Sequence, residues 1–100
     1  MAQFDVYVEP GSKERLLLTV QSDVLDGLVV RMVIPLFPMR PSTPIMNRLN
    51  PVVTIQDQAF VVMTQLMAPI PVKALGPPVA RLDDETDAIF NALDMLFKGF

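Results

Sequence analysis

Short runs of alternating apolar and polar residues, separated by turn signals, set the strongest limit on the fold of this chain. Residues 3–8 place Phe4, Val6 and Val8 on one side and polar or amphipathic residues on the other, which is the period of a half-buried β-strand. A Pro-Gly turn signal separates this run from a second run at residues 15–23. Two strands that flank a short polar turn predict an antiparallel hairpin.

The middle of the chain continues in short strands. Residues 30–34 predict a third strand, which we expect to end at Pro35 because proline removes a backbone donor. Residues 51–55 and 59–63 flank a Gln-Asp-Gln sequence and predict a second hairpin. Together these runs indicate a mostly antiparallel sheet.

Proline limits two further segments. Between Phe37 and Pro51 it recurs every few residues, which predicts a long loop with at most short helical turns. Residues 69–75 form another apolar run, but Pro69 and Pro71 confine the predicted strand to a sheet edge or a bulge.

The C-terminal segment carries the only convincing helix pattern. Asp83 and Asp84 are predicted to supply its N-cap, and Lys98 and Gly99 mark its C-terminal end. Apolar residues recur at helical spacing along one stripe: Ala88, Ile89, Ala92, Leu93, Leu96 and Phe97. We therefore predict a single domain over residues 1–100, mostly β with a C-terminal α-helix.

The residue inventory excludes many catalytic and metal chemistries. The chain has no Cys and no His, which removes disulfides, thiolate ligands and imidazole catalysis. No glycine-rich phosphate loop occurs, and we predict neither a cofactor nor a metal. The acidic cluster at residues 83–87 indicates helix capping rather than cation binding, and Asp23 and Asp26 indicate a turn rather than a catalytic carboxylate pair. A net charge of −3 disfavours direct nucleic-acid binding.

No segment predicts a membrane anchor or an export signal. The longest uncharged run, residues 58–72, is interrupted by proline and is too short to span a bilayer. The first five residues contain neither a basic leader nor an apolar signal region. We therefore expect a cytoplasmic protein that does not insert into membranes.

The apolar content predicts a surface that a partner covers. Apolar residues make up 51% of the chain, which is more than so small a core can hide. Most of the seven methionines are expected to fill gaps in the core, with Met39 and Met46 in the proline-rich loop as candidates to face a partner. The final residue, Phe100, either folds back on the core or projects as a binding anchor.

Across nearly its whole length, the sequence resembles the CcdB family of toxins from toxin–antitoxin modules. The Val-Gln-Ser-Asp and Met-Val-Ile-Pro-Leu blocks, in this order and spacing, are the specific part of the resemblance. The stretch from Phe37 to Asn50 is the least similar part. The matching blocks are residues 3–7, 20–26, 31–36, 51–55, 63–64, 71–73 and 91–100.

The resemblance implies an SH3-like small barrel with a C-terminal helix, assembled as a homodimer. It also implies binding rather than catalysis, because members of this family bind the A subunit of DNA gyrase and trap the enzyme on cleaved DNA. A paired antitoxin neutralises the toxin through a flexible C-terminal segment, and the complex represses its own operon.

The resemblance also assigns residues to two surfaces. The gyrase-facing surface would comprise Val24, Leu25, Asp94, Phe97, Lys98, Gly99 and Phe100. The antitoxin would engage the first hairpin loop and the loop around Pro41 to Met46, with Val8, Lys13, Glu14, Arg15, Pro44 and Met46 as the expected contacts.

Three positions depart from the best-known member of the family. That member has Trp at the position of Lys98, Ile at that of Phe100 and Asn at that of Asp94. Replacing Trp by Lys removes a large apolar anchor and adds a charge, so either Phe97 and Phe100 remake the contact or the affinity for gyrase is reduced or lost. Two alternatives stay open: a divergent, non-toxic homologue that binds only the antitoxin, and a sequence-specific endoribonuclease toxin of related fold.

Overall fold

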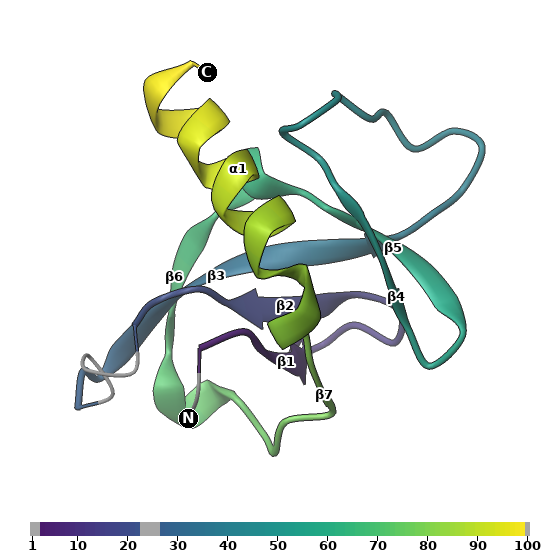
Figure 1. Ribbon diagram of the computed structural model, residues 1–100. Helices are drawn as coiled ribbons and strands as arrows, with labels where there is room; N and C mark the ends of the chain where they lie inside the picture. Colours follow the sequence, from purple (N-terminus) through teal and green to yellow (C-terminus); the bar gives the residue numbers. More distant parts are fainter. Residues whose placement is uncertain (1–2, 23–26, 100) are drawn as a thin grey trace.

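The computed structural model describes residues 3–22 and 27–99, which form one antiparallel sheet and a C-terminal helix (Figure 1). The strand order is β4-β5-β3-β2-β1-β7, and β6 also pairs with β3. The strands are β1 (Asp5–Val8), β2 (Leu16–Thr19), β3 (Val30–Pro38), β4 (Val52–Ile55), β5 (Gln58–Val62), β6 (Ala68–Pro71) and β7 (Ala80–Arg81). The sheet curls into a nearly closed barrel, which confirms the predicted mostly β fold with a C-terminal helix.

Three short 3₁₀ helices and one α-helix complete the described part of the chain. They are η2 (Thr64–Leu66), η3 (Val72–Ala74), η4 (Asp83–Glu85) and α1 (Thr86–Lys98). The first half of α1 lies against the sheet, whereas its C-terminal half extends away from the strands (Figure 1). Within the described residues, no helix has the length and apolar character that crossing a membrane requires.

Both predicted hairpins are confirmed. β1 and β2 pair antiparallel with Val6 opposite Leu18, and β4 and β5 pair with Ile55 opposite Gln58. The tight turn between β4 and β5 has positive φ angles at Gln56 (52°) and Asp57 (65°). Positive φ at both central residues defines a type I′ turn, whose twist matches that of the flanking strands.

The third strand does not end at Pro35 as predicted, because β3 continues to Pro38. The Pro35 carbonyl oxygen accepts a hydrogen bond from the backbone N–H of Met63 at 3.0 Å. The backbone of Pro35 therefore faces the end of β5, where its missing N–H removes only one bond from the ladder. Pro38 lies beyond the end of β2, which pairs with β3 only as far as Leu36. A proline in either place leaves the strand intact.

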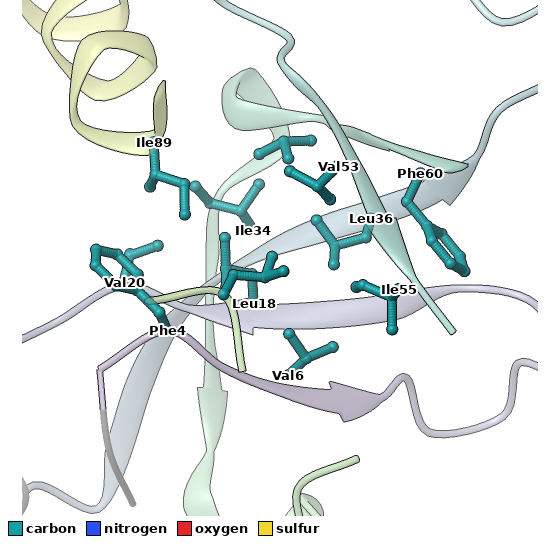
Figure 2. Packing of buried hydrophobic residues seen from close by; sticks show 12 residues of the cluster. Phe4, Val6, Leu18, Val20, Ile34, Leu36, Val53, Ile55, Phe60 and Ile89 are labelled. Carbon is teal, nitrogen blue, oxygen red and sulfur yellow. The ribbon is translucent and has the colours of Figure 1, made fainter. Parts of the chain in front are cut away.

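The hydrophobic core fills the inside of the curled sheet. Side chains from β1, β2 and β3 meet those of β4 and β5 there, and Ile89 of α1 closes one side (Figure 2). The Phe4 and Phe90 rings meet edge to face with centroids 5.5 Å apart, which fixes the start of α1 on the sheet. The core residues are Phe4, Val6, Leu18, Val20, Ile34, Leu36, Val53, Ile55, Phe60, Val62, Leu82 and Ile89.

The outer side of β1 and β2 is also buried, which differs from the half-buried strand that the alternation predicted. Asp5 and Tyr7 of β1 are buried, as is Thr19 of β2. The Thr19 hydroxyl donates to the Asp5 carbonyl oxygen at 3.0 Å, and Arg81 Nε donates to the Asp5 carboxylate at 3.3 Å. Val8, predicted on the apolar side, is 48% exposed because it lies at the end of the strand beside the open hairpin loop.

The two ends of α1 differ in how well they match the prediction. Asp83 and Asp84 do not cap the α-helix, because both lie in η4 and α1 begins at Thr86. The N-cap residue of α1, Glu85, makes no side-chain capping hydrogen bond, and the Thr86 hydroxyl donates to the Asp83 carbonyl oxygen at 2.6 Å. At the other end the prediction is confirmed: Gly99 has φ of 81° and its N–H donates to the Met95 carbonyl oxygen at 3.1 Å.

The proline-rich loop, residues 39–51, contains no helix or strand, as predicted, and two buried polar side chains fasten it to the sheet. The Asn50 amide donates to the Val62 carbonyl oxygen at 3.1 Å and to Gln65 Oε1 at 2.7 Å. Asn50 Oδ1 accepts the N–H of Met46 at 3.0 Å, and the Thr64 hydroxyl donates to the carbonyl oxygen of Leu49 at 2.6 Å. The loop is therefore held in place by specific hydrogen bonds, although it has no regular structure.

β6 and the methionines complete the comparison with the sequence. The predicted strand at residues 69–75 is shorter than expected, because β6 ends at Pro71 and the chain turns into η3. Within the part of the chain that the structure describes, β6 pairs with β3 alone, which confirms that it is an edge strand. Met63 is buried as expected for core filling, whereas Met39 and Met46 are exposed.

Candidate partner-binding surfaces

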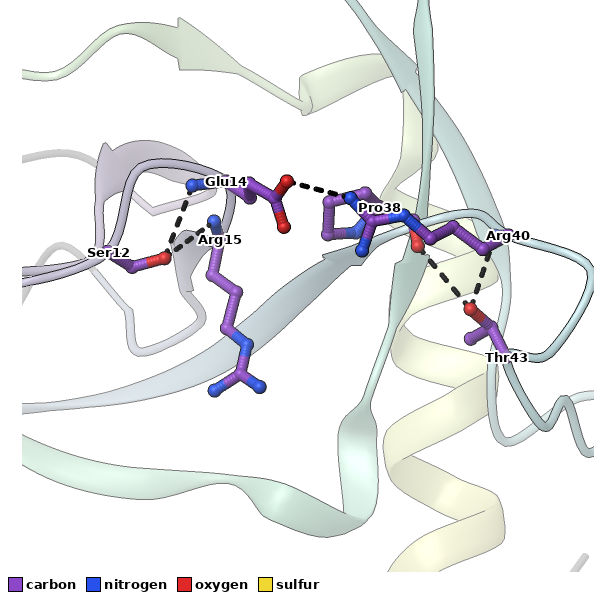
Figure 3. A network of polar contacts seen from close by, with 6 residues as sticks. All are labelled: Ser12, Glu14, Arg15, Pro38, Arg40 and Thr43. Atoms are coloured by element: carbon purple, nitrogen blue, oxygen red, sulfur yellow. Dashed lines mark hydrogen bonds and ion pairs between the residues drawn. The ribbon is translucent and has the colours of Figure 1, made fainter.

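The first hairpin loop and the proline-rich loop lie side by side and form one surface, here named the hairpin-loop surface (Figure 3). Arg40 Nη2 donates to Glu14 Oε1 at 2.8 Å and so connects the two loops. The Ser12 hydroxyl oxygen accepts the N–H groups of Glu14 at 3.2 Å and Arg15 at 3.0 Å, which shapes the hairpin loop. The surface is defined by Val8, Lys13, Glu14, Arg15, Arg40 and Pro44.

The side chain of Arg15 packs on an aromatic ring. Its guanidinium carbon lies 4.3 Å from the centroid of the Phe37 ring, within the range of a cation–π contact. Glu9 is 4.0 Å away at its nearest carboxylate oxygen. Half of the Arg15 side chain remains exposed, so its charge is available at the surface.

Two hollows flank the ion pair between Arg40 and Glu14. The first has a volume of about 310 Å³, and Val8 and Lys13 line it together with Ile55 and Phe60 from the core. The second has a volume of about 250 Å³ and is lined by Arg15, Phe37 and Pro44. Apolar and charged side chains together line both hollows, an arrangement that can accommodate a peptide segment.

The structure brings together all but one of the predicted antitoxin contacts. Val8 and Lys13 line the first hollow, Arg15 and Pro44 line the second, and Glu14 lines both. Met46 is exposed in the same loop but lines neither hollow.

Sequence reasoning missed Arg40, which joins the two loops. Its position between Pro38 and Pro41, with a charge opposite to that of Glu14, was the one available signal. It also missed Ile55 and Phe60, because residues that complete the core give no sign that one side of them is accessible.

The end of α1 forms a second surface, here named the helix-tail surface and defined by Asp94, Phe97, Lys98 and Gly99. Phe97 is 69% exposed, so its predicted place in the buried stripe is wrong. The helix is about 20 Å long, and it has left the sheet by its last turn. Lys98 Nζ lies 3.7 Å from Asp94 Oδ1, one turn away, which puts a solvated ion pair beside the exposed ring.

Three of the predicted gyrase contacts, Val24, Leu25 and Phe100, lie outside the described residues, as do Asp23 and Asp26. The residues that follow position 27 are strongly apolar. Leu28, Val29 and Val30 form a hollow of about 520 Å³ with Pro71, Val72 and Lys73, and Val29 is 81% exposed. Sequence reasoning did not locate this exposed apolar patch, and that a partner covers it stays a prediction.

Within the described residues, neither surface holds a cluster typical of a metal centre. Across residues 3–22 and 27–99, no three Asp or Glu side chains are close enough together to hold a metal ion. Recognition through exposed apolar and charged side chains is what these surfaces can provide.

Comparison with known families adds one finding. A family model described as CcdB protein matches residues 3–99, which is nearly the whole chain.

Proposed function

Because this chain belongs to the CcdB family and is a toxin of a toxin–antitoxin module, we propose that it poisons DNA gyrase by binding the A subunit. Binding would trap the enzyme on cleaved DNA, and the chain itself would make or break no covalent bond. The paired antitoxin would neutralise the toxin by binding the hairpin-loop surface.

The exposed ring of Phe97 carries the gyrase proposal. Phe97 leaves 69% of its surface in water, so a partner that covers the ring gains hydrophobic free energy that the free protein does not have. Aromatic anchors of this kind dominate the energy of many protein interfaces. Asp94 and Lys98 form an ion pair in the same part of α1 and Gly99 follows the helix, so four of the residues that the family resemblance assigns to gyrase lie at the end of one helix.

A homodimer would strengthen this binding. In a two-fold assembly each helix tail occurs twice, and a partner that has the same symmetry gains affinity by engaging both. Exposed apolar residues such as Val29 and Val30 provide surface that a second copy can cover. Cross-linking and light scattering at micromolar concentration would measure the stoichiometry.

Lys98 gives a specific reason to keep a second candidate, a non-toxic homologue that binds only the antitoxin. Its ammonium group lies 3.7 Å from Asp94, so docking an apolar pocket over Phe97 requires desolvation of two charges. In this case the hairpin-loop surface would remain functional and the helix-tail surface would not.

Expression in bacteria, followed by measurement of covalent gyrase–DNA complexes, tests the proposal. We expect growth arrest and accumulation of cleaved complex with the unaltered chain, and a loss of both with Phe97→Ala. Asn91→Ala is the matched control, because Asn91 is exposed on α1 outside the helix-tail surface. Normal growth without cleaved complex at high expression would reject gyrase poisoning, and defined RNA cleavage by the pure protein would favour the endoribonuclease alternative.

A further inference from the structure

The sheet has three exposed edges in the described residues, and they differ in how well they are protected against pairing with another strand. β7 has two residues and follows Pro77 and Pro78, and β6 carries Pro69 and Pro71. Proline and short length are common ways to block an edge. β4, with the sequence Val-Val-Thr-Ile, contains neither proline nor a charged residue.

The register of β4 shows which of its backbone groups face outward. The N–H of Val62 donates to the carbonyl oxygen of Pro51, and Ile55 lies opposite Gln58 across the two-residue turn. Hydrogen-bonded pairs alternate along an antiparallel ladder, so Val53 and Ile55 direct their N–H and C=O groups to β5. Val52 and Thr54 therefore direct theirs away from the sheet, where a further strand can pair with them.

The hollow of about 310 Å³ lies beside this free edge. Ile55 and Gln56, at the end of β4, line one side, and Val79, just before β7, lines the other. The two ends of the sheet thus flank the hollow, and Leu16 and Phe60 supply apolar surface within it. Its volume is at the lower end of the range for ligand pockets, which suits a large side chain rather than a cofactor.

Charge at the rim favours an acidic occupant. Arg40 is neutralised by Glu14 at 2.8 Å. Lys13, which also lines the hollow, forms no ion pair with any carboxylate of the described chain. A carboxylate on the docked segment would form an ion pair with Lys13.

We propose that the antitoxin binds as an added β-strand along β4, with one large apolar side chain in the hollow between the two sheet ends and an acidic residue beside Lys13. This inference rests on the proposed antitoxin binding and specifies its form. Up to four main-chain hydrogen bonds, at Val52 and Thr54, would provide affinity, and the hollow would provide specificity. The added strand would occupy the remaining gap in the barrel.

Residue-resolved amide hydrogen exchange tests the proposal on the full chain, free and bound to the purified product of the reading frame directly upstream of its gene. In the free protein, we expect slow exchange at Val53 and Ile55 and fast exchange at Val52 and Thr54. In the complex, exchange at Val52 and Thr54 should slow at least tenfold. Binding that leaves these two amides unprotected would overturn strand addition but leave antitoxin binding intact.

A pair of variants provides an independent test of the same edge. Thr54→Pro removes only an outward N–H, whereas Thr54→Val keeps it and retains the side-chain shape. We expect Thr54→Pro to bind roughly tenfold more weakly than Thr54→Val, with equal accumulation of cleaved gyrase complex in the absence of the upstream product. Equal binding by both variants would contradict the proposal, and if Thr54→Pro does not fold, the exchange pattern of the unaltered chain decides. Absence of any binding by the upstream product would overturn the antitoxin assignment itself and the inference with it.

Discussion

Asn50 is the best place to test whether buried hydrogen bonds hold the proline-rich loop in its functional position. The residue is 4% exposed, and its side chain makes three hydrogen bonds, to Val62, Gln65 and Met46. Asn50→Ala removes all three and leaves a small cavity. Both ends of the attachment are affected, because Met46 belongs to the loop and Val62 belongs to β5.

The size of the effect follows from the state of the groups left behind. Each lost bond removes about 1 kcal/mol, and a buried group left without a partner costs about 1–3 kcal/mol. Water can reach the exposed Met46 and Gln65, whereas the buried Val62 carbonyl oxygen keeps only a long hydrogen bond of 3.5 Å from the Thr64 hydroxyl and therefore bears the larger cost. We expect the free energy of unfolding to fall by about 3 kcal/mol, which lowers the Tm of a domain of this size by roughly 12–24 °C.

Urea denaturation followed by circular dichroism measures this change, and Asn47→Ala is the matched control. Asn47 is exposed in the same loop, so its substitution should alter the free energy of unfolding by less than about 0.5 kcal/mol. Below the unfolding transition, Asn50→Ala should also weaken antitoxin binding while gyrase poisoning persists. A loss of stability no larger than that of the control would refute the reasoning that these bonds fasten the loop.

Four further substitutions test the core, the surface ion pair and the helix end. Ile89→Ala, which empties a buried position between α1 and the sheet, should lower the free energy of unfolding by about 2–4 kcal/mol in urea denaturation; a loss below about 1 kcal/mol would contradict the packing described. Arg40→Ala and Glu14→Ala should each change stability by less than about 1 kcal/mol, and a double-mutant cycle should show coupling below about 1 kcal/mol because both side chains are exposed. Gly99→Ala, which forces a β-carbon onto a φ of 81°, should cost about 1 kcal/mol and fray the last turn of α1, measured as lower helical ellipticity; unchanged ellipticity would argue against the C-terminal cap.

The parts of the fold that the sequence predicted are those that local patterns determine. Alternation on both sides of the Gln-Asp-Gln sequence was enough to predict the β4–β5 hairpin, although the turn has two residues rather than three because β5 already begins at Gln58. Gly99 marked the end of α1 correctly, since the αL cap depends on one residue and its immediate neighbours.

The errors share one cause, which is dependence on distant parts of the chain. Pro35 does not end β3, because its backbone faces the end of β5 where little pairing remains. Phe97 continues the apolar stripe of α1 but extends beyond the sheet that would have covered it. Neither outcome can be deduced without the arrangement of the strands.

The same contrast applies to the binding surfaces. The family resemblance named Val8, Lys13 and Glu14, and the structure brings them together. Arg40 was missed because its partner Glu14 is distant in the sequence and adjacent only after folding.

The turn at Gln56 and Asp57 has a practical consequence for protein engineering. Type I′ turns favour Asn-Gly, whereas Gln56 must hold a left-handed backbone at φ of 52° without the small or flexible side chain that relieves crowding there. Rewriting this dipeptide as Asn-Gly would leave the β4–β5 ladder unchanged and should raise the unfolding temperature. This turn is therefore a position where substitution can make the protein more heat-stable, which would be useful if the protein served as a scaffold for display libraries.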